Sequence, residues 1–272
     1  MDRLKIMHEE LQSVKFWRAV LAEFVAMVLL LFVGLGATST FGGQSADTVH
    51  IALVFGLAIA TLVHCTAHIS GGHLNPAVTL AFLVMHRITP LRATLYIASQ
   101  MLGATVGTAL CRLVTPLSNN RYLGPTVVDE DILPSQAIVV EILLTFQLVW
   151  TVFATVDGGR KDITGSGPLA IGISVVIGHL SGIKYTGASM NPARSFGSAA
   201  IGGQWENHWV YWVGPALGGI IAAMSYDWIM DPNSNWDRVK KCATCEYGET
   251  ENDEENHVTV LEPLPGNSAR NG

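Results

Sequence analysis

Two stretches, SGGHLNPAV at residues 70–78 and TGASMNPARSFG at residues 186–197, decide the fold of this chain. Each contains the triplet Asn-Pro-Ala, as Asn75-Pro76-Ala77 and as Asn191-Pro192-Ala193, and the triplets begin 116 residues apart (191 − 75). Asparagine is a favoured N-cap and proline is favoured at the first helical position. Each triplet therefore predicts the start of a helix, at matching places in the two halves of the chain.

The apolar runs that follow the triplets, residues 77–85 and 193–200, are too short to cross a bilayer. About ten residues at 1.5 Å each give roughly 15 Å, half of the ~30 Å hydrocarbon core. We expect two half-helices that enter the membrane from opposite faces.

The composition indicates that lipid is the solvent. Of the 272 residues, 49% are apolar and only 14% are charged, whereas soluble domains carry about 25% charged residues. The net charge of −6 does not describe the whole chain, because acids cluster near its end: Glu246, Glu249, Glu251, Asp253, Glu254 and Glu255. The sequence has no basic patch that would indicate a nucleic-acid partner. Its four cysteines do not form the disulfide framework that is typical of secreted proteins.

Six apolar segments are long enough to be membrane spans. We expect them at roughly residues 17–37, 49–67, 91–114, 136–156, 168–183 and 208–230. Helices are required, because an open chain in lipid must satisfy its backbone groups within each segment. The fold class is therefore an all-α membrane protein with six transmembrane helices and two re-entrant half-helices.

Lysine and arginine set the orientation. They gather in the N-terminal segment, in the second and fourth connections and in the tail, which all fall on one side: Arg3, Lys5, Lys15, Arg18, Arg87, Arg92, Arg160, Lys161, Arg238, Lys240 and Lys241. The positive-inside rule then places both termini in the cytoplasm. We expect a cytoplasmic N-terminus (1–15), a channel domain (16–231) and a disordered cytoplasmic tail (232–272).

The channel domain is predicted to be an inverted repeat, with halves at about residues 16–115 and 136–231. Glu23 and Glu141, the acids of the first and fourth spans, are 118 residues apart (141 − 23), close to the spacing of the triplets. Inverted repeats place a site near the bilayer midplane. There the two helix tips, each with about half a positive charge, and the amides of Asn75 and Asn191 would repel cations and protons while water passes.

With these motifs the chain resembles the aquaporin (major intrinsic protein) family over roughly residues 16–231. The resemblance implies a water-selective channel in a membrane, expected to be the plasma membrane, and a homotetramer with one pore per subunit. It also implies an outer constriction at Phe55, His179, Ala188 and Arg194. Glycerol-conducting relatives have a small residue at the position of His179 and an aspartate after the arginine, where this chain has Ser195.

Three other residues are given supporting roles. Glu23 and Glu141 are expected to anchor the glycine-rich approaches to the triplets by accepting backbone N–H bonds. His73 either faces the cytoplasmic mouth and responds to pH or caps its loop, and the second role is preferred.

Alternative functions remain open at this point. The channel could also pass glycerol, urea or ammonia; the repeat could belong to an ion-coupled transporter; or the protein could be a junction protein with a closed pore. An enzyme is not expected, and no cofactor or metal site is predicted. Cys242-x-x-Cys245 is typical of half a zinc site or of a redox motif, but no second half is nearby. Acylation of these cysteines is the other interpretation.

Overall fold

The computed structural model describes residues 3–40, 47–116, 124–160 and 165–230. These residues form helices and connections only. Several sequence predictions fall outside the described residues: the tail with Cys242, Cys245 and its acidic cluster, and the basic residues Lys161, Arg238, Lys240 and Lys241.

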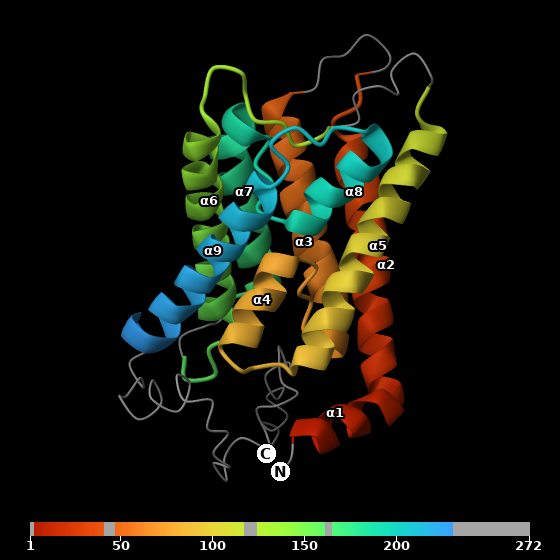
Figure 1. Cartoon of the computed structure of the whole chain (residues 1–272), viewed down its shortest axis with the longest axis vertical. Coiled ribbons are helices and arrows are strands. Elements are labelled where there is room, and N and C mark those ends of the chain that lie inside the picture. The colour runs from red at the N-terminus through yellow and green to blue at the C-terminus, as the bar shows by residue number, and fades with distance from the viewer. Residues whose placement is uncertain (1–2, 41–46, 117–123, 161–164, 231–272) are drawn as a thin grey trace, which may run out of the picture.

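Six long helices form the bundle in the described part of the chain (Figure 1). They are α2 (Val14–Gly36), α3 (Thr48–Ser70), α5 (Pro90–Val114), α6 (Pro134–Thr155), α7 (Gly167–Thr186) and α9 (Val210–Ser225). A short helix α1 (Arg3–Gln12) precedes them, and the π-helix η3 (Tyr226–Met230) continues α9. All of these long helices except α9 are long and apolar enough to cross a membrane, and α9 has 16 residues before the five of η3. All six predicted segments are therefore helical, and five of them meet the length and apolarity of a membrane span.

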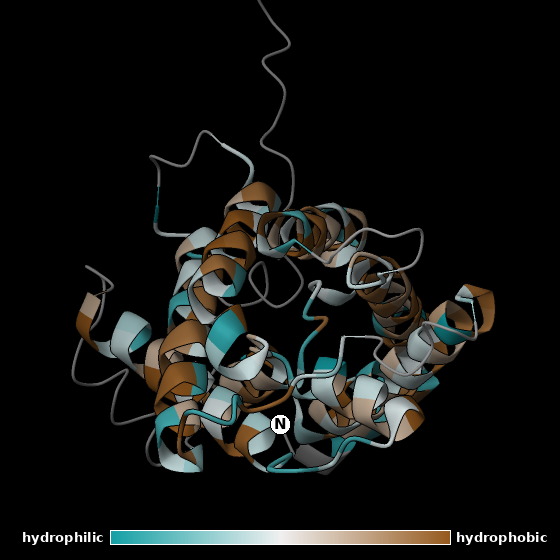
Figure 2. Ribbon diagram, turned by 90° about the horizontal axis from the view of Figure 1, so that it is seen from above, coloured by the Kyte–Doolittle hydropathy of each residue, from teal (hydrophilic) through white to brown (hydrophobic). Residues whose placement is uncertain are grey.

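Apolar side chains cover the outside of the bundle, as a lipid environment requires. In Figure 2 the long helices stand around the re-entrant connections and carry many apolar residues. On α2, exposed apolar side chains recur every three or four residues, namely Leu21, Val25, Leu29 and Phe32. This spacing gives one continuous apolar stripe along the helix.

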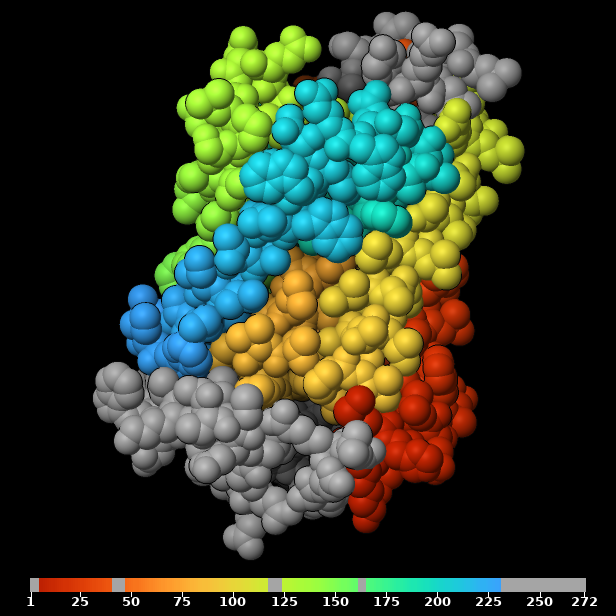
Figure 3. Space-filling model, in the orientation of Figure 1, coloured from red at the N-terminus to blue at the C-terminus, as the bar shows by residue number. Residues whose placement is uncertain are grey.

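The two half-helices are α4 (Pro76–Val84) and α8 (Pro192–Gly202), so the expected half-length runs are confirmed. They start at mid-height and point to opposite ends of the bundle, α4 to the lower end of Figure 1 and α8 to the upper end. Figure 3 shows α4 (orange) and α8 (cyan) one above the other between α5 and α9. Together they span the bundle as one discontinuous helix.

The packing of the long helices repeats in the two halves. Helix α2 packs on α5 as α6 packs on α9, and α3 packs on α7 across the middle. Glycines allow the first two pairs to approach closely. A Cβ on Gly107 of α5 would lie 2.3 Å from the carbonyl oxygen of Val28, and one on Gly218 of α9 would lie 2.3 Å from that of Ile142. This is the small-residue packing that lets helices approach in lipid.

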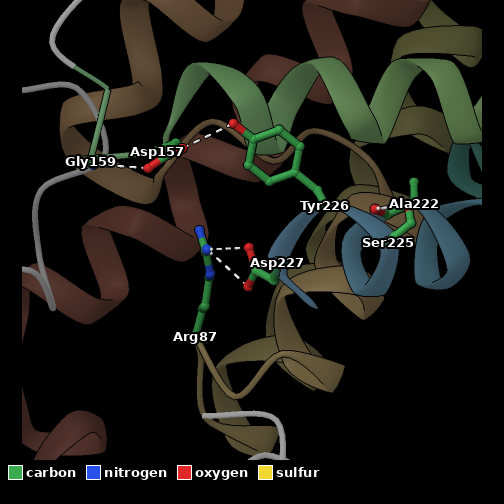
Figure 4. A network of polar contacts seen from close by, with 7 residues as sticks. All are labelled: Arg87, Asp157, Gly159, Ala222, Ser225, Tyr226 and Asp227. Carbon is green, nitrogen blue, oxygen red and sulfur yellow. Dashed lines mark hydrogen bonds and ion pairs between the residues drawn. The ribbon is translucent and has the colours of Figure 1, made fainter. Parts of the chain in front are cut away.

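A polar network joins three chain segments at the lower end (Figure 4). Arg87, from the α4–α5 connection, donates to both carboxylate oxygens of Asp227 in η3 at 2.8 and 3.0 Å. The Tyr226 hydroxyl donates to Asp157, beyond the end of α6, at 3.0 Å. The Arg87 guanidinium also lies over the Phe153 ring, 4.8 Å from its centroid. The network therefore ties the end of α9 to the α4–α5 connection and to the residues that follow α6.

The close approach of α2 and α5 can be tested with Gly107→Ala. The added Cβ meets the backbone of Val28, and such overpacking costs about 1–3 kcal/mol. We expect a lower midpoint of thermal unfolding in detergent. The control is Gly36→Ala in α2, where an added Cβ meets no atom within 4 Å, so alanine can only favour the helix. Equal midpoints for the two variants would contradict the packing described here.

Candidate functional site

Asn75 and Asn191 cap the two half-helices in the same way. The Oδ1 atom of Asn75 accepts from the backbone N–H of Ala77 at 2.8 Å. That of Asn191 accepts from Ala193 at 3.1 Å and from Arg194 at 3.3 Å. Each following proline occupies the first helical turn, where a missing N–H costs nothing. Capping therefore fixes each side chain with its oxygen toward the helix and its NH₂ group away from it.

The NH₂ groups of the two asparagines tie the halves together. Asn75 Nδ2 donates to the carbonyl oxygen of Met190 at 2.7 Å, and Asn191 Nδ2 donates to that of Leu74 at 2.8 Å. Each bond runs from one half to the residue that precedes the triplet of the other half. Because an amide nitrogen carries two hydrogens, one N–H of each asparagine is left for another acceptor.

Leu74 and Met190 adopt a left-handed backbone to present these carbonyls. Their φ angles are both 51°, although neither residue is glycine. Non-glycine residues in this region carry about 1–3 kcal/mol of strain, which surrounding contacts must hold. The N–H of Leu74 donates to Glu23 at 2.7 Å, and that of Met190 donates to Glu141 at 2.9 Å. The two buried carboxylates therefore hold the strained residues.

Glu23 is fully buried and accepts hydrogen bonds on both oxygens. Its Oε1 atom accepts from the Ser70 hydroxyl at 2.6 Å and from the His73 N–H at 3.0 Å. Its Oε2 atom accepts from Leu74 and from the Gln100 side chain at 2.8 Å. Four donors replace the water that the carboxylate loses on burial.

Glu141 repeats this arrangement in the second half. Its Oε1 atom accepts from the Thr186 hydroxyl at 2.6 Å and from the Ser189 N–H at 2.9 Å. With the bond from Met190, each half has one carboxylate that holds the glycine-rich approach to its triplet. The positions are those at which the sequence analysis expected loop anchors.

Two tyrosines complete this framework and were missed in the sequence. The Tyr96 hydroxyl donates to the carbonyl of Ser70 at 2.9 Å, and the Tyr211 hydroxyl donates to that of Thr186 at 3.0 Å. A signal was present, since Tyr96 and Tyr211 are 115 residues apart (211 − 96) and Ser70 and Thr186 are 116 apart (186 − 70). Gln100 donates to Glu23 in the first half. No glutamine is among the hydrogen-bond partners of Glu141.

A cavity leads from the first triplet toward the lower end of the bundle. Its polar lining comes from the backbone of Gly71 and Gly72, from His73 and from Asn75. Its apolar lining comes from α3, α4, α6 and α7 and includes Ile59, Val63, Val78, Leu148, Val152 and Val175. A mostly apolar wall with a short polar strip binds water only along that strip.

His73 lies in this cavity with its ring held on two sides. Its Nδ1 atom is 3.1 Å from the Thr79 hydroxyl, and its centroid lies 4.6 Å from that of Phe82 and 5.4 Å from that of Tyr96. The side chain is buried although it lines the cavity. The position fits both the mouth-lining and the capping interpretations, so the role of His73 stays a prediction.

Three of the four predicted constriction residues come together on the other side of the triplets. The rings of Phe55 and His179 are stacked with centroids 4.8 Å apart, and the Arg194 guanidinium carbon lies 5.3 Å from the centroid of Phe55. They belong to α3, α7 and α8. Ala188 is buried beside Gly182 of α7, where an added Cβ would lie 3.3 Å from the Cβ atom of Ala188.

These residues hold buried polar atoms that no protein atom satisfies. His179 Nε2, Arg194 Nε and Arg194 Nη1 have no hydrogen-bond partner within the described residues. His179 Nδ1 lies 3.0 Å from the carbonyl oxygen of Val175, so in the neutral ring Nδ1 carries the proton and Nε2 is an acceptor. The constriction therefore presents an acceptor and two donors, which together suit one water molecule.

No group of three or more histidine, cysteine, aspartate or glutamate side chains gathers in a metal-binding arrangement within the described ranges. The buried carboxylates of Glu23 and Glu141 are occupied by protein donors. The candidate site consists of the cavity beside His73 and Asn75, the two asparagines, and the group of Phe55, His179 and Arg194.

The profile of the family described as "Major intrinsic protein" matches residues 10–226. The chain is 52% identical over 222 residues to "Aquaporin-4" of Bos taurus, covering 80% of this chain and 69% of that protein. It is 44% identical over 267 residues to "Aquaporin FA-CHIP" of Pelophylax lessonae, covering 93% and 98%.

A solved structure is also similar. The X-ray structure of the aquaglyceroporin from Plasmodium falciparum superposes with a TM-score of 0.72 at 26% identity, covering 79% of this chain and 97% of that one. The likeness extends through nearly the whole of that structure.

The anchoring carboxylates can be tested with Glu23→Gln and Glu141→Gln. Glutamine keeps the shape of the side chain. Its NH₂ group takes the place of a carboxylate oxygen that accepted hydrogen bonds, so it faces N–H or O–H donors and cannot accept from them. Each lost bond to a charged group is worth about 1.5–3 kcal/mol. We expect both variants to unfold at lower temperature in detergent. Glu9→Gln, at an exposed site on α1, is the matched control, and its midpoint should not move; if the three variants behave alike, the carboxylates are not anchors.

Proposed function

The chain belongs to the major intrinsic protein family and is a water-selective channel of the membrane; from this premise we propose which of its residues conduct and select. Residues 16–231 form the channel domain. Water passes in single file along the cavity beside Asn75, past both asparagines, and through a constriction at Phe55, His179, Ala188 and Arg194. The observation that carries this proposal is the reciprocal bonding of the two asparagines at the meeting point of the half-helices.

The central asparagines explain the exclusion of protons. One N–H of Asn75 and one of Asn191 remain for a water oxygen after capping and cross-bonding. A water whose lone pairs are engaged by two donors cannot readily accept a proton from its neighbour. Each half-helix also points the positive end of its dipole at this place, worth about half a charge. Cations and protons meet an unfavourable field there, whereas a neutral dipole does not.

The outer constriction explains the preference for water. The stacked rings of Phe55 and His179 occupy the space that a carbon chain would need. The unpartnered atoms of His179 and Arg194 replace the hydrogen bonds that water loses on leaving bulk solvent. The fixed charge of Arg194 adds a barrier to cations.

Other readings of the inverted repeat are less well supported. An ion-coupled carrier needs carboxylates that bind the coupling ion near the midplane, but Glu23 and Glu141 are engaged by serine, threonine and backbone donors. The proposal includes no catalytic step.

The proposal also covers location and assembly. The distribution of lysine and arginine supports an orientation with both termini in the cytoplasm, and the family supports placement in the plasma membrane and assembly into a homotetramer.

The direct test of function uses vesicles that contain the purified protein. Stopped-flow light scattering measures shrinkage under sucrose and then under glycerol, while a pH-sensitive dye reports proton leak. We expect fast water flow with a low activation energy and no protein-dependent flow of glycerol or protons. Glycerol entry as fast as that of water would overturn the selectivity, and a protein-dependent proton leak would overturn the role of the asparagines.

The path itself can be tested by blocking it. Val63→Trp and Val152→Trp place large rings in the cavity from α3 and α6, and we expect water flow to fall at least about tenfold. Leu57→Trp is the control, because Leu57 is 55% exposed on another face of α3. All three variants are first checked for normal elution as monodisperse protein. Flow lost in Leu57→Trp, or kept in both cavity variants, would show that water takes another path.

Selectivity is predicted to depend on the two stacked rings. The double variant Phe55→Ala and His179→Ala removes them and leaves Arg194 in place, so glycerol and urea should pass while water flow stays within about twofold. The control is Phe146→Ala and Trp150→Ala, a ring pair on α6 that packs edge to face. Vesicle shrinkage under glycerol measures the difference; a double variant that still excludes glycerol would contradict the proposed constriction.

A further inference from the structure

A pair of histidines on the outside of α3 has no role in the pore. His64 and His68 are both exposed, as is Cys65 beside them, whereas the pore-lining residues Phe55 and Val63 of the same helix are buried. The pair therefore faces away from the water path.

The spacing of the pair puts both imidazoles on one face of the helix. Residues four apart on an α-helix are neighbours, with Cβ atoms about 5–6 Å apart. Neither side chain has a hydrogen bond or an ion pair with any described residue, so no group in that part of the chain competes for the ring nitrogens. Ionisable side chains on a membrane helix are costly and usually mark a partner or a function.

The depth of the pair allows an ion to reach it from water. Helix α3 has 23 residues, about 35 Å at 1.5 Å per residue, which exceeds the ~30 Å hydrocarbon core. Counted back from Ser70, His68 lies about 3 Å and His64 about 9 Å from the end of the helix. Both rings are thus near the lower end of the bundle, within reach of the headgroup region.

We propose that His64 and His68 form a binding site for a divalent transition-metal ion, with Zn²⁺ as its ligand. Two histidines at this spacing on one helical face are an established zinc-ligating arrangement, and imidazole suits Zn²⁺, Cu²⁺ and Ni²⁺. Since no cluster of three metal-ligating side chains occurs in the described residues, water molecules complete the coordination.

The bound ion would link two successive turns at the end of α3. This end leads into the re-entrant segment: Ser70 donates to Glu23, and Gly71 follows with a left-handed φ of 90°. An ion held only by the folded helix stabilises that helix by linkage. The expected effect of Zn²⁺ is therefore greater thermal stability, without any change in the water path.

The test measures Zn²⁺ binding by titration calorimetry on the full chain in detergent. All proteins carry Cys242→Ala and Cys245→Ala, since that pair could bind zinc by itself. In this background we expect His64→Ala and His68→Ala each to weaken Zn²⁺ binding at least about tenfold, as loss of even an outer partner of a metal ligand costs 10–100-fold. The two controls are His50→Ala, an exposed histidine of α3 with Val54 four residues on, and Cys65→Ala; both should bind as the parent does.

Thermal unfolding with and without Zn²⁺ gives a second readout. The midpoint should rise with Zn²⁺ in the parent and in both controls, and should not rise in either histidine variant. Water flow without metal should be equal in all of them. The proposal is overturned if the parent does not bind Zn²⁺, if Cys65→Ala or His50→Ala removes binding, or if the histidine variants keep it.

Discussion

The structure depends on one reciprocal contact: the amide of each triplet asparagine donates to the backbone carbonyl just before the other triplet. The contact lies where two half-helices begin inside an apolar bundle, with no bulk water to satisfy polar groups. It requires Leu74 and Met190 to adopt left-handed conformations, and these in turn require the buried carboxylates of Glu23 and Glu141. Each step satisfies a polar group that the previous one would leave buried without a partner.

The same balance of hydrogen bonds supports the proposed path of water. In the framework around the triplets, the carboxylates, hydroxyls and tyrosines find protein partners. The histidine and arginine of the constriction do not. Since a buried polar atom without a partner costs about 1–3 kcal/mol, these atoms are stable only if a solvent molecule visits them. In the proposed channel, the atoms that select water are therefore those that the fold leaves without protein partners. These atoms remain available to hydrogen-bond water.

The sequence predicted the architecture well because duplication leaves a regular signal. Six apolar segments and two capped half-helices could be predicted from the sequence. The matching spacing of Glu23 and Glu141 predicted that the two acids have the same role in the two halves. The ends of helices were less accurate: the fifth span extends to Thr186 rather than residue 183, because its glycine-rich end still forms helix until Gly187 caps it. The cross-bonds of the asparagines could not be predicted, since they join residues more than 100 positions apart through side-chain orientation. Tyr96 and Tyr211 were overlooked because tyrosine in an apolar helix is ordinary until its hydroxyl partner is known.

The most direct measurement of the central claim is an experimental density map of the protein in lipid, at a resolution that shows ordered water. The account predicts that Asn75 Nδ2 contacts both the carbonyl of Met190 and a pore water, that Asn191 Nδ2 contacts both that of Leu74 and a pore water, and that these waters belong to one continuous file. Asparagine amides turned away from the file, or a file interrupted between the two half-helices, would contradict it.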